Sequence, residues 1–193
     1  MKLIITPLFI AISSFCFSQN TVKYSTYKTD NTKNSYSIIL DYDNQLGLNY
    51  ILINVESTDP IYKNSTFIIK GTELAKFRAY LAFISVKQTE WDLINISNKT
   101  KEIIKQIDWD EEMSLNCSYS DGPIYIDTPL HTNYVFMNGN SSIDISTSRF
   151  EYTKRSRIFF LTKSFFSAFK EKIDPNKIKS FINSDYQKKS LLK

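Results

Sequence analysis

The sequence predicts an α+β fold, in which an antiparallel, meander-like β-sheet carries one long central helix and a C-terminal helical region on one face. Three observations lead to this prediction. Apolar and polar residues alternate with a period of two over most of the chain, as they do in half-buried strands. The period changes to that of a helix over residues 72–95 and again after residue 164. Strands and helices do not follow each other in strict alternation, which argues against a parallel α/β sheet.

Residues 1–18 have the features of a cleavable secretory signal peptide. Lys2 precedes an apolar run of about fifteen residues, which is shorter than the roughly twenty residues that a membrane-spanning helix requires. We expect cleavage after Ser18 to leave a single globular domain of residues 19–193, periplasmic or extracellular and without a transmembrane helix. Phe15 precedes Cys16, where a lipoprotein signal requires a small residue, so we favour simple cleavage over lipid attachment. An uncleaved membrane anchor or a buried strand is the alternative interpretation.

The first part of the mature chain is expected to form four strands. Tyr36, Ile38 and Leu40 alternate with polar residues, and the turn-forming residues 43–47 separate this strand from the next one, which predicts a hairpin. The Asp59-Pro60 pair then interrupts the chain before the fourth strand. The expected strands span residues 22–28, 36–42, 48–55 and 65–70.

The longest helix is expected over residues 72–95, where Leu74, Phe77 and Leu81 recur at helical spacing and Thr72 is a candidate N-cap. Residues 101–107 are expected to form a short second helix. From residue 115 the period of two returns, and helical spacing follows it near the C-terminus. This part predicts strands at 115–120, 124–127, 132–137, 142–147 and 152–161, and helices at 164–173 and 176–186.

A weak internal repeat links the two parts of the chain. Phe67, Ile69 and Leu74 recur in the same order and spacing as Phe159, Leu161 and Phe166, each time where a strand passes into a helix. One interpretation is two similar halves, each a β-meander followed by a helix, that share one sheet. Chance similarity between two strand–helix junctions is the alternative.

The chain has few residues that could perform covalent or metal chemistry. After signal cleavage Cys117 is the only cysteine, and His131 is the only histidine. These counts exclude an intramolecular disulfide and the usual zinc ligand sets. Cys117 shares its predicted strand face with Leu115, so we expect a buried, inert thiol rather than a catalytic partner of His131. All glycines are isolated, which excludes phosphate-binding loops and the nucleophile elbow. We therefore predict no catalytic residue, metal ion or cofactor.

An acidic run formed by Asp108, Asp110, Glu111 and Glu112 follows the central helical region. Carboxylates are the ligands that calcium prefers, so a calcium site is one interpretation of this run. The run lacks the glycine and the alternating ligands of an EF-hand loop. We therefore expect a solvated loop.

A basic cluster near residue 150 supplies the candidate ligand-binding residues, which are Arg149, Tyr152, Arg155 and Arg157. Basic side chains interleaved with aromatic ones can bind anionic glycans or nucleic acid. Basic residues on an edge strand also prevent aggregation, which is the alternative explanation. The net charge of +4 at pH 7 is a small excess, and it gives no support to a nucleic-acid partner.

These observations favour an exported, non-enzymatic binding protein whose partner is a protein, a glycan or a small apolar ligand. The prediction rests on the lack of catalytic and cofactor motifs and on the many aromatic residues of the predicted strands, such as Tyr36, Tyr125 and Tyr134. Two alternatives remain open. An exported hydrolase would use carboxylates or a lone serine in a deep cleft. An envelope-associated structural protein would expose a large apolar patch and self-associate.

Overall fold

The computed structural model describes residues 20–27, 36–43, 45–56, 64–119, 124–147 and 156–191, and the expected signal peptide (residues 1–18) lies outside them. Within these residues the chain forms nine strands and three α-helices. The strands are β1 (Asn20–Tyr27), β2 (Tyr36–Tyr42), β3 (Leu48–Glu56), β4 (Asn64–Lys70), β5 (Glu102–Ile107), β6 (Ser114–Tyr119), β7 (Ile124–Met137), β8 (Asn140–Thr147) and β9 (Arg157–Phe160). The helices are α1 (Leu74–Ser97), α2 (Lys163–Lys172) and α3 (Pro175–Ser190), and a short 3₁₀ turn, η1 (Gly71–Glu73), leads into α1.

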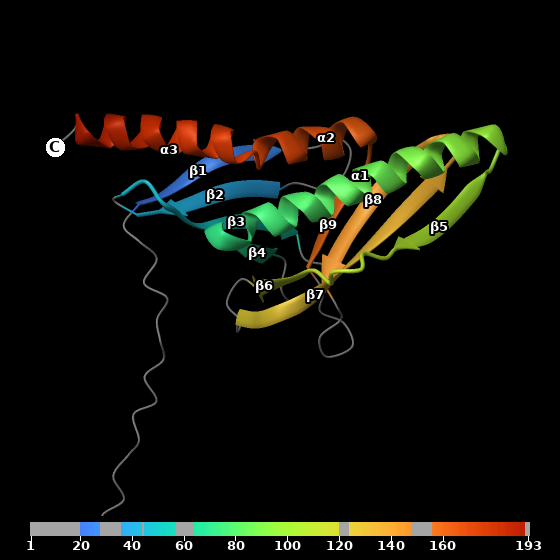
Figure 1. Cartoon of the computed structure of the whole chain (residues 1–193), viewed down its shortest axis with the longest axis horizontal. Helices are drawn as coiled ribbons and strands as arrows, with labels where there is room; N and C mark the ends of the chain where they lie inside the picture. Colours follow the sequence, from blue (N-terminus) through green and yellow to red (C-terminus); the bar gives the residue numbers. More distant parts are fainter. Residues whose placement is uncertain are drawn as a thin grey trace, which may run out of the picture.

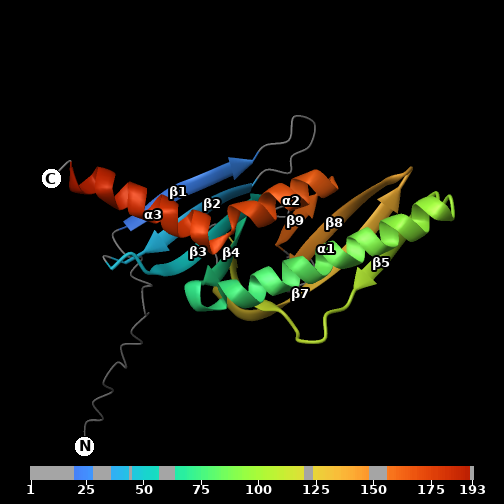
Figure 2. The same ribbon diagram turned by 45° about the horizontal axis from the view of Figure 1, so that its top comes forward.

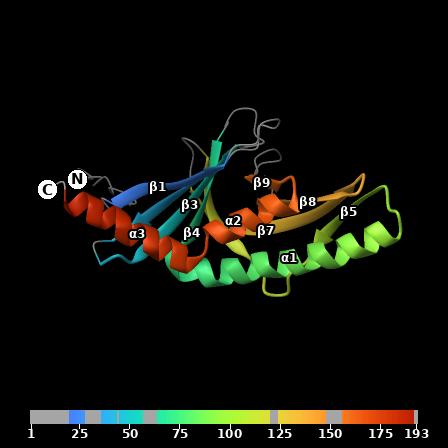
Figure 3. The ribbon, with the colours of Figure 1, turned by 90° about the horizontal axis from the view of Figure 1, so that it is seen from above.

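The strands form one antiparallel sheet in the order β1-β2-β3-β4-β6-β7-β8-β9, with β5 added beside β7. α2 and α3 follow each other along the molecule, and α1 runs beside them (Figures 1 and 2). All three helices lie on the same face of the sheet (Figure 3). The predicted α+β fold with one long helix and a C-terminal helical region is therefore confirmed. Among the described helices, none combines the length and the apolar character needed to cross a membrane.

Aromatic side chains fill the space between the sheet and the C-terminal helices. Phe160 of β9 lies with its ring centroid 5.0 Å from those of Phe166 and Phe169 in α2. Tyr36 of β2 stacks on Phe165 with centroids 5.6 Å apart. Replacing one such buried ring by alanine costs about 3 to 5 kcal/mol in a typical core. The burial of these rings is therefore the main force that holds α2 on the sheet.

The C-terminal half of α1 is attached by a different set of contacts. Tyr134 of β7 donates its hydroxyl hydrogen to Asp92 Oδ1 at 3.0 Å and accepts a hydrogen bond from Asn95 Nδ2 at 3.2 Å. Trp91 packs edge-on against the same ring. Burial raises the pKa of Tyr134 to about 12, so the phenol stays neutral at physiological pH. A buried aromatic residue with a satisfied hydroxyl thus fixes the end of the helix over β7.

The short helix predicted over residues 101–107 is wrong, because Glu102–Ile107 form strand β5 instead. A helix of this length is marginal without tertiary support, whereas β7 offers six backbone partners, from Glu102↔Met137 to Ile107↔Thr132. The β-branched residues Ile103, Ile104 and Ile107 also suit a strand better than a helix. The prediction failed because strand pairing, which the local sequence does not reveal, decided the conformation.

The predicted N-cap at Thr72 is also wrong. The helical segment begins one residue earlier, with η1, and no side chain caps it. A Cβ atom on Gly71 would lie 1.9 Å from the backbone oxygen of Leu48, so only glycine fits where β4 passes directly into the helix. The close approach of two backbone segments, rather than side-chain capping, sets this boundary.

The strands expected at 124–127 and 132–137 are one continuous strand, β7, which runs through Pro129. Proline lacks a backbone N–H group, so within a sheet it is confined to bulges and to positions at an edge. Pro129 is at an edge on one side, because it pairs with Ser114 of β6 while the pairing of β7 with β8 begins only at Leu130.

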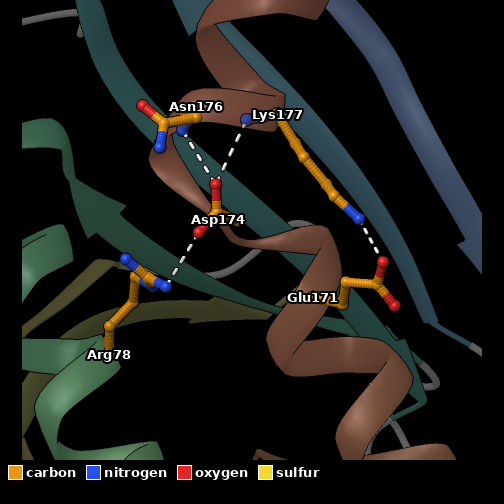
Figure 4. Close-up of polar contacts among 5 residues, drawn as sticks. All are labelled: Arg78, Glu171, Asp174, Asn176 and Lys177. Atoms are coloured by element: carbon orange, nitrogen blue, oxygen red, sulfur yellow. Dashed lines mark hydrogen bonds and ion pairs between the residues drawn. The ribbon is translucent and has the colours of Figure 1, made fainter.

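The turn between α2 and α3 is held by Asp174 (Figure 4). Its Oδ1 atom accepts hydrogen bonds from the backbone N–H groups of Asn176 and Lys177, at 3.0 and 3.3 Å. Its Oδ2 atom accepts a hydrogen bond from Arg78 Nη2 of α1 at 2.9 Å. Pro175 follows at the first helical position, where its missing N–H group costs nothing. One carboxylate therefore caps α3 and joins it to α1.

We expect Asp174→Ala to lower the free energy of unfolding by about 1 to 2 kcal/mol, since it removes an N-cap and a partly exposed ion pair. Asn176→Ala is the matched control, because only the backbone of Asn176 takes part in the cap. Urea unfolding followed by circular dichroism measures both variants. Equal losses in the two variants would contradict a capping role for Asp174.

Candidate functional site

A loop interrupts the sheet where β5 and β6 meet along β7. Ile107 pairs with Thr132, and Ser114 pairs with Pro129. The six residues 108–113 therefore lie opposite only two residues of β7, Leu130 and His131. An ordinary β-bulge inserts a single extra residue. This insertion is larger than pairing requires, and we call it the 108–113 loop.

Contacts at both ends hold the 108–113 loop beside α1 (Figure 2). The backbone N–H group of Leu130 donates to the Met113 carbonyl oxygen at 2.7 Å, which ties the loop to β7. Lys76 Nζ of α1 donates to the Glu111 carbonyl oxygen at 3.2 Å. The ring of Trp109 packs against Tyr80 of α1, with centroids 5.2 Å apart. The backbone of the loop is therefore anchored, and the ring of Trp109 is held against α1.

The 108–113 loop, α1 and β7 enclose a cavity of about 220 Å³, which we call the loop pocket. Its inner part is formed by the buried residues Tyr80, Ile107 and Met113. Trp109, which is partly buried, forms an aromatic wall. The exposed residues Gln106, Asp108, Glu112 and His131 lie around the opening. The pocket thus combines an apolar interior with a polar rim that includes two carboxylates, Asp108 and Glu112.

Two interactions define the polar character of the loop pocket. Gln106 Nε2 donates a hydrogen bond to Asp108 Oδ1 at 2.6 Å, which orients that carboxylate. The Tyr80 hydroxyl pairs with the Thr132 hydroxyl. Burial raises the pKa of Tyr80, so this phenol is neutral at physiological pH and contributes its ring rather than a charge. Tyr80 therefore adds no negative charge to the carboxylates at the rim of the pocket.

Glu112 has a strained backbone within the loop. Its φ angle is 39°, in the left-handed region that residues with a Cβ atom rarely adopt. Residues kept in such conformations cluster at functional sites, because the surrounding structure must hold them there. The conformation places Glu112 at the rim of the loop pocket.

Three of the four candidate binding residues from the sequence, Arg149, Tyr152 and Arg155, lie outside the described residues. Arg157 lies on β9, where its Nε atom donates to Asp144 Oδ1 at 2.7 Å. Its guanidinium group lies 4.9 Å from the centre of the Phe159 ring. Both contacts hold Arg157 on the sheet surface, away from the loop pocket.

Cys117 and His131 occupy different environments. Cys117 is fully buried, its Sγ atom lies 3.6 Å from Thr128 Oγ1, and burial raises the pKa of the thiol. His131 is exposed at the rim of the loop pocket. Within the described part of the chain, no three His, Cys, Asp or Glu side chains gather where they could bind one metal ion.

The sequence singled out the acidic run and His131 separately, and the structure brings members of both to one pocket. Antiparallel pairing along β7 causes this, because it sets the 108–113 loop opposite His131. Trp109 and Gln106, which also line the pocket, were not among the residues predicted from the sequence. A tryptophan between two aspartates was the available signal, since a large aromatic residue is unusual in a fully solvated loop. No known protein family, curated protein or solved structure matches this chain significantly.

We expect Glu112→Gly to raise the free energy of unfolding by about 0.5 to 1 kcal/mol, because glycine adopts the left-handed conformation without strain. Lys99→Gly is the control, since Lys99 has a φ of 53° in the turn after α1, remote from the pocket. Thermal and urea unfolding measure both variants. A loss of stability in Glu112→Gly alone would instead show that the Glu112 side chain holds the loop.

Proposed function

We propose that this chain is an exported, non-enzymatic binding protein whose ligand occupies the loop pocket. One observation carries the proposal. The 108–113 loop is longer than the sheet requires, yet contacts to α1 and β7 hold it beside a cavity with an aromatic wall and a rim that includes two carboxylates. A structural connection between β5 and β6 would need neither the extra residues nor the strain at Glu112.

The sequence left three classes of partner open, which are a protein, a glycan and a small apolar ligand, and the pocket favours one of them. A volume of about 220 Å³ is below the range of roughly 300 to 1,000 Å³ for drug-sized ligands, so the pocket suits a single small group. A purely apolar ligand would remove water from Asp108 and Glu112 without offering hydrogen bonds. A sugar unit has an apolar face for Trp109 and hydroxyl donors for the carboxylates. We therefore propose a glycan, bound through one sugar unit.

The two tryptophans of the chain make the proposal testable by fluorescence. Trp109 lines the loop pocket, whereas Trp91 packs against Tyr134 and beneath Lys105. Mature protein purified gently from its host is first examined by native mass spectrometry, and a retained mass identifies the ligand. Neutral mono- and oligosaccharides are then titrated. We expect the fluorescence response to persist in Trp91→Phe and to disappear in Trp109→Phe.

Trp109→Ala is expected to weaken the affinity about tenfold, since it removes the aromatic wall. A response that survives in Trp109→Phe but vanishes in Trp91→Phe would place the ligand elsewhere and refute the proposal.

The hydrolase alternative would use the same pocket, with Asp108 and Glu112 as its carboxylates. Product analysis separates the two functions, because a binding protein returns its ligand unchanged.

A second candidate is an envelope-associated structural protein that assembles with copies of itself. Apolar side chains are exposed near the end of α1 and along β5, including Leu93 (68%), Ile96 (60%) and Ile104 (65%). β5 pairs only with β7 among the described strands, so its other edge presents backbone groups to a further strand. These features favour pairing of β5 with the β5 of a second copy.

The charges of β5 favour a symmetric register centred on Ile104 over the two registers next to it. A two-fold axis at Ile104 sets Ile104 opposite its own copy, Glu102 opposite Gln106 and Lys105 opposite Ile103. Moving the axis by one residue in either direction sets lysines opposite each other, either Lys105 with Lys105 or Lys101 with Lys105. Like charges directly opposite destabilise a strand pair. The register at Ile104 avoids this repulsion.

We expect the mature protein to form a concentration-dependent dimer that Ile104→Lys abolishes, because two lysines would then meet at the axis. Ile126→Lys is the matched control, since Ile126 is 68% exposed but lies in the part of β7 that does not pair with β5. Size-exclusion chromatography with light scattering measures the mass. A monomer at every concentration would exclude this candidate.

A further inference from the structure

A second cleft lies where β2 and β4 end and β3 begins, next to the start of α1. Its volume is about 420 Å³, and its lining includes Asp41, Tyr50, Lys70 and Thr72. Gly71 packs against the backbone of Leu48 at its base. We call it the β4–α1 cleft. Its lining residues differ entirely from those of the loop pocket.

The β4–α1 cleft contains a buried carboxylate that lacks a full set of partners. Asp41 is only 1% exposed, and its Oδ1 atom accepts a hydrogen bond from Asn49 Nδ2 at 2.9 Å. Its Oδ2 atom is buried and has no hydrogen-bond partner within the described residues. A buried carboxylate with a bare oxygen is unfavourable, because it has lost water without gaining a compensating donor. Among the described residues, Asp41 Oδ2 therefore still requires one hydrogen-bond donor.

The sheet itself directs Asp41 into this cleft. Leu40 and Tyr42 are buried on the helix side, with Tyr42 donating a hydrogen bond to Asp185 of α3. Alternation along the strand thus turns Asp41 to the other face. The pairing of Asp41 with Tyr50 and of Tyr42 with Leu48 leaves Asn49 as an extra residue, and this bulge brings its amide to Asp41.

The charge of Asp41 is not balanced by the lysine of the cleft. Lys70 pairs with Tyr50 in register, but its Nζ atom binds Glu73 Oε1 at 3.0 Å. No ion pair of the described residues includes Asp41. A divalent metal ion would need several oxygen ligands, and Asp41 supplies the only carboxylate among the described residues that line the cleft. A single cationic hydrogen-bond donor fits one carboxylate oxygen without a partner better than a metal ion does.

We propose that the β4–α1 cleft binds a primary ammonium group, which donates a hydrogen bond to Asp41 Oδ2. Its remaining N–H groups face the hydroxyl-bearing residues Tyr50 and Thr72, which also line the cleft. Two kinds of ligand carry this group. A simple alkylamine would bind through it alone, whereas a free amino acid would also place its carboxylate near Lys70.

The test uses three small probes of similar size at constant pH and ionic strength. Propylammonium carries only the cation, L-alanine carries the cation and a carboxylate, and propionate carries only the anion. Each is titrated into the ¹⁵N-labelled mature protein, and the amide resonances around Asp41, Asn49 and Gly71 are followed. We expect saturable shifts with propylammonium, L-alanine or both, and none with propionate.

Asp41→Asn is expected to weaken ammonium binding about tenfold or more, because a charge-assisted hydrogen bond becomes a neutral one. Asp110→Asn removes one charge from an exposed loop position and serves as the matched control. Tighter binding of alanine than of propylammonium identifies an amino-acid site, and the reverse identifies an amine site. Failure of both ammonium probes to bind, or equal binding by Asp41→Asn, would overturn the proposal.

Thermal unfolding shows whether Asp41→Asn still folds, so that a loss of binding is interpretable. We expect its Tm without ligand to equal or exceed that of the parent protein, since an uncompensated buried charge is removed. Ammonium probes should raise the Tm of the parent protein and leave that of Asp41→Asn unchanged. A marked fall in Tm for Asp41→Asn would show that the carboxylate serves the fold instead. Trp109→Phe should bind the probes normally, which separates this test from that of the loop pocket.

Discussion

The pairing of β7 is the constraint on which the rest of the structure depends. This strand is 14 residues long, and it holds β6 and then β5 along one edge and β8 along the other. Buried backbone groups must find hydrogen-bond partners, and strands occupy both edges of β7 from Thr132 to Met137. β7 thereby joins the strands β1–β4 to β8 and β9 in one sheet. The change of partner near Pro129 is also what forces the 108–113 loop out of the sheet.

The helices follow from the apolar face that this sheet presents. Aromatic residues of β2 and β9 bind α2, and Tyr134 of β7 holds the end of α1. Asp174 then connects the C-terminal helices to α1 through Arg78. Because the helices cover one face, the two cavities form at places where the regular structure is interrupted. One is the break between β5 and β6, and the other is the junction of β4 with α1.

The two cavities share a physical origin but differ in chemistry. In both, one segment has more residues than the strand with which it pairs, and polar side chains there turn away from the backbone hydrogen bonds of the sheet. The extra residues are the 108–113 loop in the first cavity and Asn49 in the second. The loop pocket has exposed carboxylates beside an aromatic wall, which suits a neutral ligand rich in hydroxyl groups. The β4–α1 cleft has one buried carboxylate, which suits a compact cation. The same chain therefore has two places where a ligand could complete the polar interactions.

The sequence by itself determined the fold class, the hairpin of β2 and β3, the long central helix and the C-terminal helices, because periodicity and turn residues are local signals. It also indicated the burial of Cys117. Only the tertiary structure decided that residues 101–107 form a strand and that Gly71, rather than Thr72, sets the start of the helical segment. It alone joined Trp109, Glu112 and His131 in one pocket and left Asp41 Oδ2 without a hydrogen-bond partner among the described residues. Each of these depends on contacts between segments distant along the chain, and no local pattern encodes which segments pair.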